Sequence, residues 1–361
     1  MKRSFTAVML FTLLLILSRA QGQQWQFILL GDDRSDKKPQ AMDSAAVNTA
    51  ELSAIAKDVA SLKPDFILFT GDLAFGYTDN TAWFRAGLEQ WYAAMKPIFD
   101  VGIPVYPVRG NHDAACPDSA RVWKQFLADH RIDVPMNGPA GEKGLTFYFD
   151  HVNARIIGLD DYQGKSFPGS PDQAGPLFPH VVSNEWLKNL PATQPGTHIF
   201  AFSHEMPFRV GRHDDSLNSN PVARDLMMKT LFSMGGRVFL SGHDHDYDLV
   251  SAVDPNDKTG NTAMLQMVAG TAGAPFYSEI KRIGNSWPLT PHGHWTKTYG
   301  YILVQVEGKK ATLIFYGRDT LASPPETKYT EKQRVSYDLT SMPPVFTFTP
   351  DRKGNVDIDG N

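Results

Sequence analysis

Residues 65–72 have the sequence DFILFTGD, an apolar, strand-like run that stops at a Gly-Asp pair. A run without alternation is typical of a strand buried on both faces of a sheet. Similar runs end at polar clusters elsewhere: GDDR at 31–34, GNHD at 110–113, the His of FAFSHEMP at 200–207, and GHDH at 242–245. Because ligands bind beyond the carboxyl ends of strands in open α/β sheets, we expect these clusters to form one site.

The strand-like runs alternate with helical patterns, which predicts an α/β fold. Apolar residues within 47–62 fall on one face of a helix, and Lys63-Pro64 then ends it. Strands are expected at 25–30, 65–70, 104–108, 146–150, 154–159, 197–202, 237–240, 301–306 and 311–316, and helices at 47–62, 88–98, 184–190 and 222–234. Parallel strands mixed with hairpins indicate two packed sheets with helices outside.

Length and charge limit the classes of function. With 361 residues, 42% of them hydrophobic, the chain can bury a sizeable core in one large domain or two modest ones. Its net charge of −4 gives no general attraction to nucleic acid or to an anionic membrane. The single cysteine, Cys116, is expected to be buried and unreactive. The oligomeric state stays open.

The N-terminal segment is typical of an export signal. Lys2 and Arg3 precede an apolar run at 5–17, and Ala20 is suited to a cleavage site. The run is shorter than the roughly 20 residues that a helix needs to span a bilayer, and no other stretch is apolar enough. We therefore expect residues 1–20 to be a signal peptide and the protein to be periplasmic or secreted. An uncleaved anchor is the alternative.

The chain changes character after Arg318. The last part contains Pro-rich turns, a short VFTFT run and a polar end. We expect residues 21–318 to form the main domain, and residues 319–361 to form a peripheral strand and a loose tail.

The polar clusters offer Asp, Asn and His side chains, a combination that suits Mn, Fe or Zn. Each cluster alone has a commoner origin. Asp32 and Asp72 follow glycines and could be turn or N-cap residues, and the isolated His204 could be a core histidine. Their joint occurrence favours a site for two metal ions about 3.5–4 Å apart, which can clamp the attacking and leaving oxygens of a phosphate ester.

With these clusters, the sequence resembles the calcineurin-like metallophosphoesterase superfamily. The motifs GDDR, GD, GNHD, SHEMP and GHDHDY carry the resemblance, and their spacing is most similar to the purple acid phosphatase-like and exported phosphodiesterase branches. The resemblance implies a four-layer α/β/β/α sandwich of two mixed sheets flanked by helices. It also implies two divalent or trivalent ions (Mn, Fe or Zn), with Asp32 and His245 on the first, Asn111, His204 and His243 on the second, and Asp72 bridging both.

The resemblance further implies a metal-dependent phosphoester hydrolase. A hydroxide bridging the two ions would attack the phosphorus of a small phosphomonoester or phosphodiester, while His112 stabilises the developing charge and protonates the leaving group. Asn111 and His112 would contact the phosphate. Phosphatase and phosphodiesterase are equally open. A catalytically silent metal-binding or scaffold protein on the same fold is the alternative from another class.

Two positions depart from the family pattern. Many relatives have a metal-binding His where this chain has Arg34, and purple enzymes have Tyr where it has Phe75. An Arg side chain cannot bind a cation, so the first ion is expected to keep more water. The Arg34 guanidinium could contact the substrate phosphate, or it could pair with Asp33 or Asp36.

Substrate choice is expected to depend on loops that the motifs do not fix. The candidates are residues 162–183, 208–221 and 273–298, which are rich in Gly, Pro or polar residues. Their aromatic and basic side chains would suit a nucleotide, although surface loops commonly hold such residues; they are His180, Arg209, Arg212, His213, Tyr277, Lys281, Arg282, His292 and His294. The HGH tripeptide in the third loop is expected to be solvated rather than to form another metal site.

Overall fold

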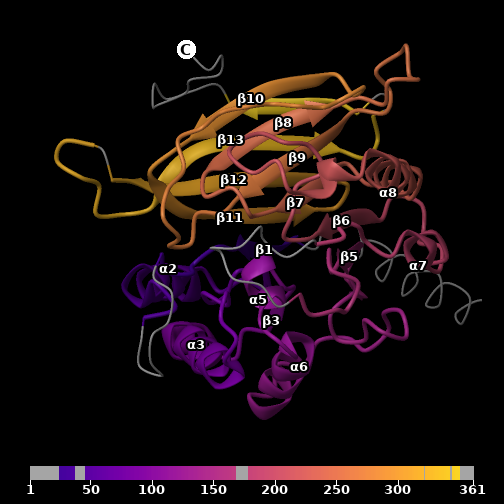
Figure 1. The fold of residues 1–361 in the computed structure, drawn as a ribbon. Coiled ribbons are helices and arrows are strands. Elements are labelled where there is room, and N and C mark those ends of the chain that lie inside the picture. The colour runs from indigo at the N-terminus through magenta and orange to yellow at the C-terminus, as the bar shows by residue number, and fades with distance from the viewer. Residues whose placement is uncertain (1–23, 37–44, 168–177, 321, 342–343, 350–361) are drawn as a thin grey trace, which may run out of the picture.

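A computed structural model describes residues 24–36, 45–167, 178–320, 322–341 and 344–349. Its strands form two seven-stranded sheets with helices on their outer faces (Figure 1). The expected signal peptide and the polar C-terminal end lie outside the described residues. Among those that are described, no helix has the length and apolar character that crossing a membrane requires.

The first sheet combines strands from both ends of the chain. Its order is β14 (Phe346–Thr349), β13 (Thr330–Asp338), β12 (Lys310–Asp319), β11 (Thr298–Glu307), β1 (Gln24–Leu30), β2 (Phe66–Phe69) and β3 (Val105–Pro107). β1 pairs in parallel with β2 and antiparallel with β11. The N-terminal strand is therefore central in the sheet, with a neighbour on each side.

The second sheet is built from the middle of the chain. Its order is β10 (Leu289–Trp295), β8 (Tyr247–Ala252), β9 (Met264–Ala269), β7 (Val238–Ser241), β6 (His198–Phe202), β5 (Ala154–Gly158) and β4 (Phe147–His151). Strands β5, β6, β7 and β9 are parallel neighbours, and the outer strands join antiparallel. Both sheets are thus mixed, as the sequence predicts.

Helices cover the outer faces of both sheets. They are α2 (Thr49–Leu62), α3 (Thr81–Ala94), α4 (Lys96–Phe99), α5 (Asn111–Ala115), α6 (Ser119–Asp129), α7 (Asn184–Lys188) and α8 (Pro221–Ser233), with a 3₁₀ turn at Leu217–Ser219. The side chain of Asn48 caps the start of α2, and Lys63 ends it in a left-handed conformation before Pro64, as expected from the sequence.

Alternate residues of β1 show the layers directly. Ile28 and Leu30 pack in a cluster with Leu52 of α2, whereas Phe27 and Leu29 pack in a second cluster between the two sheets. A third cluster lies between the second sheet and helices α7 and α8, which lie close together at the right of Figure 1. Three apolar layers between four structural layers confirm the predicted α/β/β/α sandwich.

Four strands depart from the sequence expectation, because the sequence pattern does not predict β8, β9, β10 or β13. The 273–298 segment is predicted to be a loop, but β10 runs through it, and His294 is buried beside Asp248 with 2.9 Å between Nδ1 and Oδ2. The prediction of a solvated HGH tripeptide is therefore wrong for His294. The VFTFT run forms β14 as expected, while β13 before it is not predicted by the sequence pattern. Cys116 is buried, as expected.

Candidate metal centre

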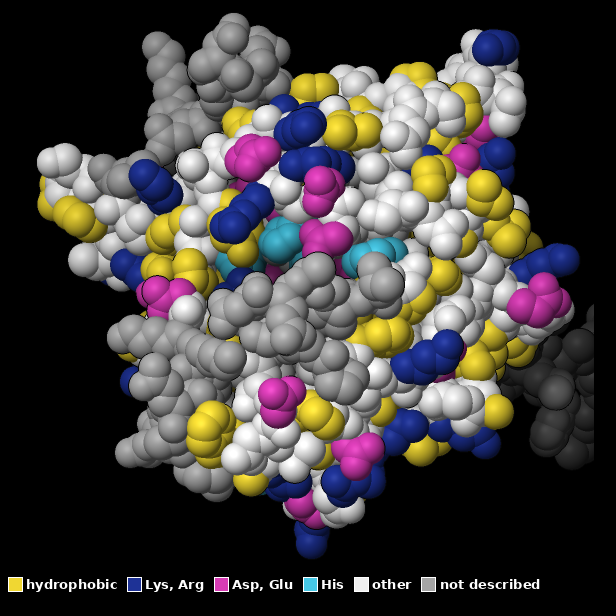
Figure 2. Space-filling view, viewed as in Figure 1, with side chains coloured by type: hydrophobic (Ala, Val, Ile, Leu, Met, Phe, Trp, Pro, Cys, Tyr) yellow, Lys and Arg dark blue, Asp and Glu magenta, His cyan; other side chains and the backbone are white. Residues whose placement is uncertain are grey.

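The polar clusters meet at one edge of the sandwich, where strands of both sheets end. Asp32, Asp72 and Asn111 follow β1, β2 and β3 of the first sheet, and His204, His243 and His245 follow β6 and β7 of the second. All six side chains are buried. In the space-filling view, histidine side chains reach the surface near the centre of this face, among acidic and basic side chains (Figure 2).

One half of the cluster presents four donor atoms to a common point. Nε2 of His204 lies 2.9 Å from Oδ1 of Asn111, 3.0 Å from Nδ1 of His243 and 3.5 Å from Oδ1 of Asp72. Nδ2 of Asn111 donates to the Tyr77 hydroxyl at 2.9 Å, which turns Oδ1 toward the histidines. The four residues come from four different strand ends.

The outer nitrogens of the two histidines fix their tautomers. Nδ1 of His204 donates to the carbonyl of Thr70 at 2.8 Å, and Nε2 of His243 donates to the carbonyl of Asp215 at 3.0 Å. Because a carbonyl only accepts, both outer nitrogens carry the proton. The inner nitrogens therefore face each other at 3.0 Å with a lone pair on each. This contact is repulsive unless a cation binds both, so this half of the cluster fits a metal ion.

The backbone is strained at three of these residues. Asp32, Asp72 and His243 have φ of 63°, 55° and 73°, although none is glycine. A left-handed conformation costs such residues about 1–2 kcal/mol each. Strain of this kind persists where the surrounding structure enforces it, and it is concentrated at functional sites.

The glycines before the ligands are needed for space. A Cβ at Gly110 would lie 2.1 Å from Oδ1 of Asp72, and a Cβ at Gly242 would lie 2.0 Å from Oδ2 of Asp32. Either contact would displace a carboxylate. The Gly-ligand pairs are thus more than strand-end turns, because close packing of the carboxylates requires them.

The other half of the cluster is organised around Arg34. Its Nε donates to Oδ2 of Asp72 at 3.2 Å, and its Nη2 lies 3.4 Å from Nε2 of His245. Nδ1 of His245 donates to the Pro275 carbonyl at 2.5 Å, so Nε2 carries the lone pair and accepts from Arg34. Of the two alternatives that the sequence leaves open for Arg34, the pairing with Asp33 or Asp36 is replaced by a pairing with Asp72. On this side, donor atoms of Asp72 and His245 are thus already engaged by a cationic side chain.

His112 lies beside the cluster at the start of α5. Its backbone N–H donates to Oδ1 of Asp72 at 3.0 Å, and its Nε2 is 4.0 Å from Oδ2 of the same carboxylate. The ring packs edge-on against Phe75 and Tyr77, and its Nδ1 has no hydrogen-bond partner among the described residues. Burial, and then the charge of Arg34, lower the pKa of His112 well below its usual value.

Two buried polar groups hold the segment that carries Asn111 and His112. Asp113 accepts from the backbone N–H of Gly110 at 2.8 Å and of Leu73 at 3.3 Å, so it caps the turn rather than orienting His112. Arg109 forms a bidentate pair with Asp160, which follows β5 of the second sheet. The pair therefore joins the two sheets beside the candidate centre.

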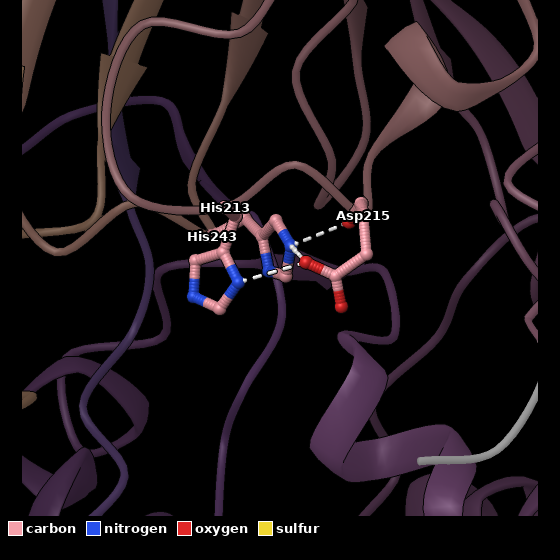
Figure 3. A group of neighbouring side chains, drawn as sticks. All are labelled: His213, Asp215 and His243. Atoms are coloured by element: carbon pink, nitrogen blue, oxygen red, sulfur yellow. Dashed lines mark hydrogen bonds and ion pairs between the residues drawn. The ribbon is translucent and has the colours of Figure 1, made fainter. Parts of the chain in front are cut away.

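Residues from the second candidate loop line the outer side of His243. Figure 3 shows Nε2 of His243 directed at Asp215, which also accepts from Nδ1 of His213 at 3.0 Å. The His213 ring stacks on His243 with ring centres 3.9 Å apart. These three residues could themselves surround a cation. Because Nε2 of His243 carries the proton, we assign His243 to the inner cluster, and His213 and Asp215 to its support.

The sequence predicts no specific role for four residues that contribute to the site: His213, Asp215, Tyr77 and Tyr277. Their signals are weak because each lies several residues beyond the end of a strand, outside the short polar clusters. Tyr277 stacks on His245 with ring centres 4.1 Å apart and accepts from Arg34 at 3.2 Å. His213 and Tyr277 do lie in the loops that are expected to shape the site.

The chain is similar to several known proteins. A family model described as calcineurin-like phosphoesterase matches residues 45–247. Tartrate-resistant acid phosphatase type 5 of Mus musculus is 22% identical over 305 residues, covering 80% of this chain and 86% of that protein. A probable inactive purple acid phosphatase 29 of Arabidopsis thaliana is 28% identical over 146 residues, covering 37% of this chain. The matched part spans about a third of that plant relative, 34% of its length.

The fold also matches a solved structure. The structure of PhoD superposes with a TM-score of 0.60 at 13% identity, covering 92% of this chain and 73% of that one. At this identity the likeness establishes the fold alone. The match extends beyond the clusters and includes most of both sheets.

Proposed function

Because this chain belongs to the calcineurin-like phosphoesterase family, we propose that it is a metal-dependent hydrolase of small phosphomonoesters or phosphodiesters. The observation that supports this most directly is the pair of inner nitrogens of His204 and His243. They face each other with a lone pair on each, within reach of two oxygen donors. A mixed set of imidazole, amide and carboxylate donors suits Mn, Fe or Zn.

We assign Asp72, Asn111, His204 and His243 to the ion on this side of the centre. When bound, the metal supplies Lewis-acid polarisation of the phosphoester and of the attacking water. The carbonyls of Thr70 and Asp215 hold both imidazoles in the tautomer that binds a cation.

Asp32 lies at the border between the two halves of the centre. It accepts from the backbone N–H of His243 at 3.0 Å and so keeps that strand end in place. A carboxylate oxygen of Asp32 also lies within 4.8 Å of ligand atoms of Asp72 and His204. Asp32 can therefore add negative charge, or a further oxygen ligand, to the same ion.

We assign His112 to contact with the phosphate and to proton transfer to the leaving group. In the resting site its lowered pKa keeps the ring neutral, with one N–H able to donate to a phosphate oxygen. A phosphate dianion nearby would raise this pKa again, because an opposite charge favours the protonated form. Binding of substrate would thus prepare His112 to deliver a proton.

The first test is hydrolysis of mono- and bis-p-nitrophenyl phosphate by protein loaded with Mn, Fe or Zn. A preference for the monoester would identify a phosphatase, and a preference for the diester a phosphodiesterase. Chelation should abolish turnover, and His112→Ala should lower kcat about 10²–10⁴-fold. His151→Ala is the matched control, because His151 is a half-exposed histidine on the sheet edge and should retain full activity.

A metal-loaded protein that hydrolyses neither ester would contradict the proposal and favour the silent scaffold.

Location is a separate part of the proposal. If residues 1–20 are a signal peptide, as we expect, the substrate is met outside the cytoplasm. Detection of a mature N-terminus at residue 21 in an exported fraction would support this.

A further inference from the structure

We propose that the Arg34 guanidinium takes the place of one metal ion, so that this chain binds a single ion where its family has a two-ion centre. The inference deepens the proposed function and rests on it for the role of the remaining ion. It concerns the half of the centre formed by Asp32, His245 and one oxygen of Asp72. The contacts of Arg34 carry the argument.

Arg34 occupies donor atoms that a second ion would need. Oδ2 of Asp72 accepts from its Nε, and Nε2 of His245 accepts from its Nη2. Oδ1 of Asp72 is the oxygen on the other side, 3.5 Å from Nε2 of His204. The Asp72 carboxylate therefore lies between the guanidinium and the donor atoms that fit a metal ion. It bridges two cationic positions, of which one is filled by a side chain.

The guanidinium is held firmly in this place. Its Nη2 also donates to the Tyr277 hydroxyl at 3.2 Å, and its Nη1 donates to the carbonyl of Ser35 at 3.2 Å. Its central carbon lies 5.9 Å from the centre of the Phe75 ring. Only 8% of Arg34 is exposed. To swing away from the centre, the side chain would have to give up four hydrogen-bonded contacts.

The two departures from the family pattern thus account for each other. Arg34 and Phe75 each stand where relatives are expected to have a metal-binding side chain, and here the two side chains pack together as a cation over an aromatic ring. Each replacement removes a ligand, and the Arg34 guanidinium supplies one positive charge at the place where the missing ion would lie.

Charge balance favours the same conclusion. Asp32 and Asp72 are both buried, and His243 and His245 each direct one ring nitrogen to a backbone carbonyl. The guanidinium, which stays protonated in proteins, already places a positive charge between the Asp72 carboxylate and His245. A second divalent ion against Arg34 would add like charge in a buried space, which is strongly unfavourable.

Metal stoichiometry tests this without reference to turnover. The full chain is stripped with a chelator, dialysed to equilibrium against excess Mn²⁺, and assayed for bound manganese and for its electron paramagnetic resonance spectrum. We expect one Mn²⁺ per chain with the spectrum of an isolated ion. Arg34→His, which removes the guanidinium and adds an imidazole, should bind two ions with an exchange-coupled spectrum.

Arg212→His is the matched control. Arg212 is exposed, and its guanidinium lies 4.6 Å from the centre of the Tyr277 ring, whereas the side chain that donates to Asp72 and His245 is Arg34. This variant should still bind one ion. Circular dichroism and thermal melting establish whether each variant is folded. If Arg34→His does not fold, the number of ions bound by the wild-type chain and its spectrum still test the inference.

Two coupled ions in the wild-type chain, or none, would overturn the inference. A folded Arg34→His variant that still binds one ion would also overturn it, because the guanidinium would then not be what excludes the second. Failure of the proposed function looks different: one bound ion with no hydrolysis of either ester. In that case the inference of a single-ion centre is supported and the proposed enzymatic function is refuted.

Discussion

Replacing Arg109 with Met should lower the free energy of unfolding by about 4 kcal/mol. Arg109 and Asp160 are both fully buried, with 0% of either side chain exposed. Nε and Nη2 of Arg109 donate to the two carboxylate oxygens at 3.0 and 2.9 Å, and Nη1 donates to the Lys165 carbonyl at 2.9 Å. The substitution leaves the Asp160 carboxylate in the core with one remaining donor, the backbone N–H of Gly164.

The magnitude follows from these contacts. Two charge-assisted hydrogen bonds contribute about 1.5–3 kcal/mol each, or about 3–6 kcal/mol together. Removal of one partner of a buried ion pair independently costs about 3–5 kcal/mol, because the other charge is left uncompensated. The two ranges overlap near about 4 kcal/mol. Since whole domains are stable by about 5–15 kcal/mol, the loss is large.

Urea unfolding at fixed Mn²⁺, followed by tryptophan fluorescence, measures the change. Arg334→Met is the matched control, because Arg334 forms the same fork with Glu331 at 2.9 and 2.7 Å but on the surface. Exposed pairs contribute about 0–1 kcal/mol, so this variant should stay close to wild type. The double variant Arg109→Met/Asp160→Asn should be more stable than the sum of its single changes by about 1–3 kcal/mol.

An Arg109→Met variant within about 1 kcal/mol of wild type would refute this reasoning. It would mean that the cost of burying the pair cancels its attraction, as happens when a buried pair is replaced by apolar residues. Strict additivity in the double variant would refute it separately, because the two side chains would then not act on each other.

Three further predictions concern metal, pH and backbone. Removal of the metal should lower Tm by several degrees, since a ligand at about 100 times its Kd stabilises the folded state by about 2.7 kcal/mol. Calorimetry with and without a chelator measures this change, and an unchanged Tm would contradict the prediction. Burial lowers the pKa of His198, so the folded chain binds this proton less tightly than the unfolded chain does. The free energy of unfolding therefore decreases as the pH falls below about 6.5. The variant His198→Gln should flatten this part of the profile of Tm against pH, and an unaltered profile would contradict the prediction. Gly71 has φ of 90°, and a Cβ there would lie 2.4 Å from the Gly110 nitrogen. Gly71→Ala should therefore lower the free energy of unfolding, measured in urea, by about 1–3 kcal/mol, and it should weaken Mn²⁺ binding because Asp72 is displaced. Wild-type values for both quantities would refute the packing argument.

The strands that carry the candidate centre are predictable from the sequence. β2 consists of FILF alone, and β6 (HIFAF) and β7 (VFLS) are apolar except for one residue at an end of each; all three are buried along their length, as in a sheet covered on both faces. A short, continuous apolar run that ends at a glycine and a polar side chain is typical of such a buried strand and of the turn that follows it. The sequence therefore locates these strand ends correctly.

Other strands carry no such signal. β13 has the sequence TEKQRVSYD, and only Val335 and Tyr337 of its apolar residues enter the core. β10 contains Pro291 and shifts its register against β8 between Pro291 and Gly293, so its sequence is typical of a loop. Both segments become strands because they pair with the edge of a sheet that the rest of the chain forms. Their own sequences do not contain that information.

The partners of Arg34 cannot be predicted for a related reason. Asp72, His245 and Tyr277 lie 38, 211 and 243 positions away in the chain. The sequence indicates that an arginine stands at an unusual place, and the nearest acidic residues are the obvious partners. Only the meeting of the two sheets brings the distant residues within reach.

The central position of β1 has a consequence for how the molecule is made. Of its two neighbours, β2 at Phe66–Phe69 follows early in the chain, whereas β11 comes only at Thr298–Glu307. As the chain emerges from a ribosome or an export channel, one edge of β1 therefore waits for a partner until most of the sequence has been delivered. An unpaired central edge is prone to wrong association, so the correct pairing of β1 depends on the late delivery of β11.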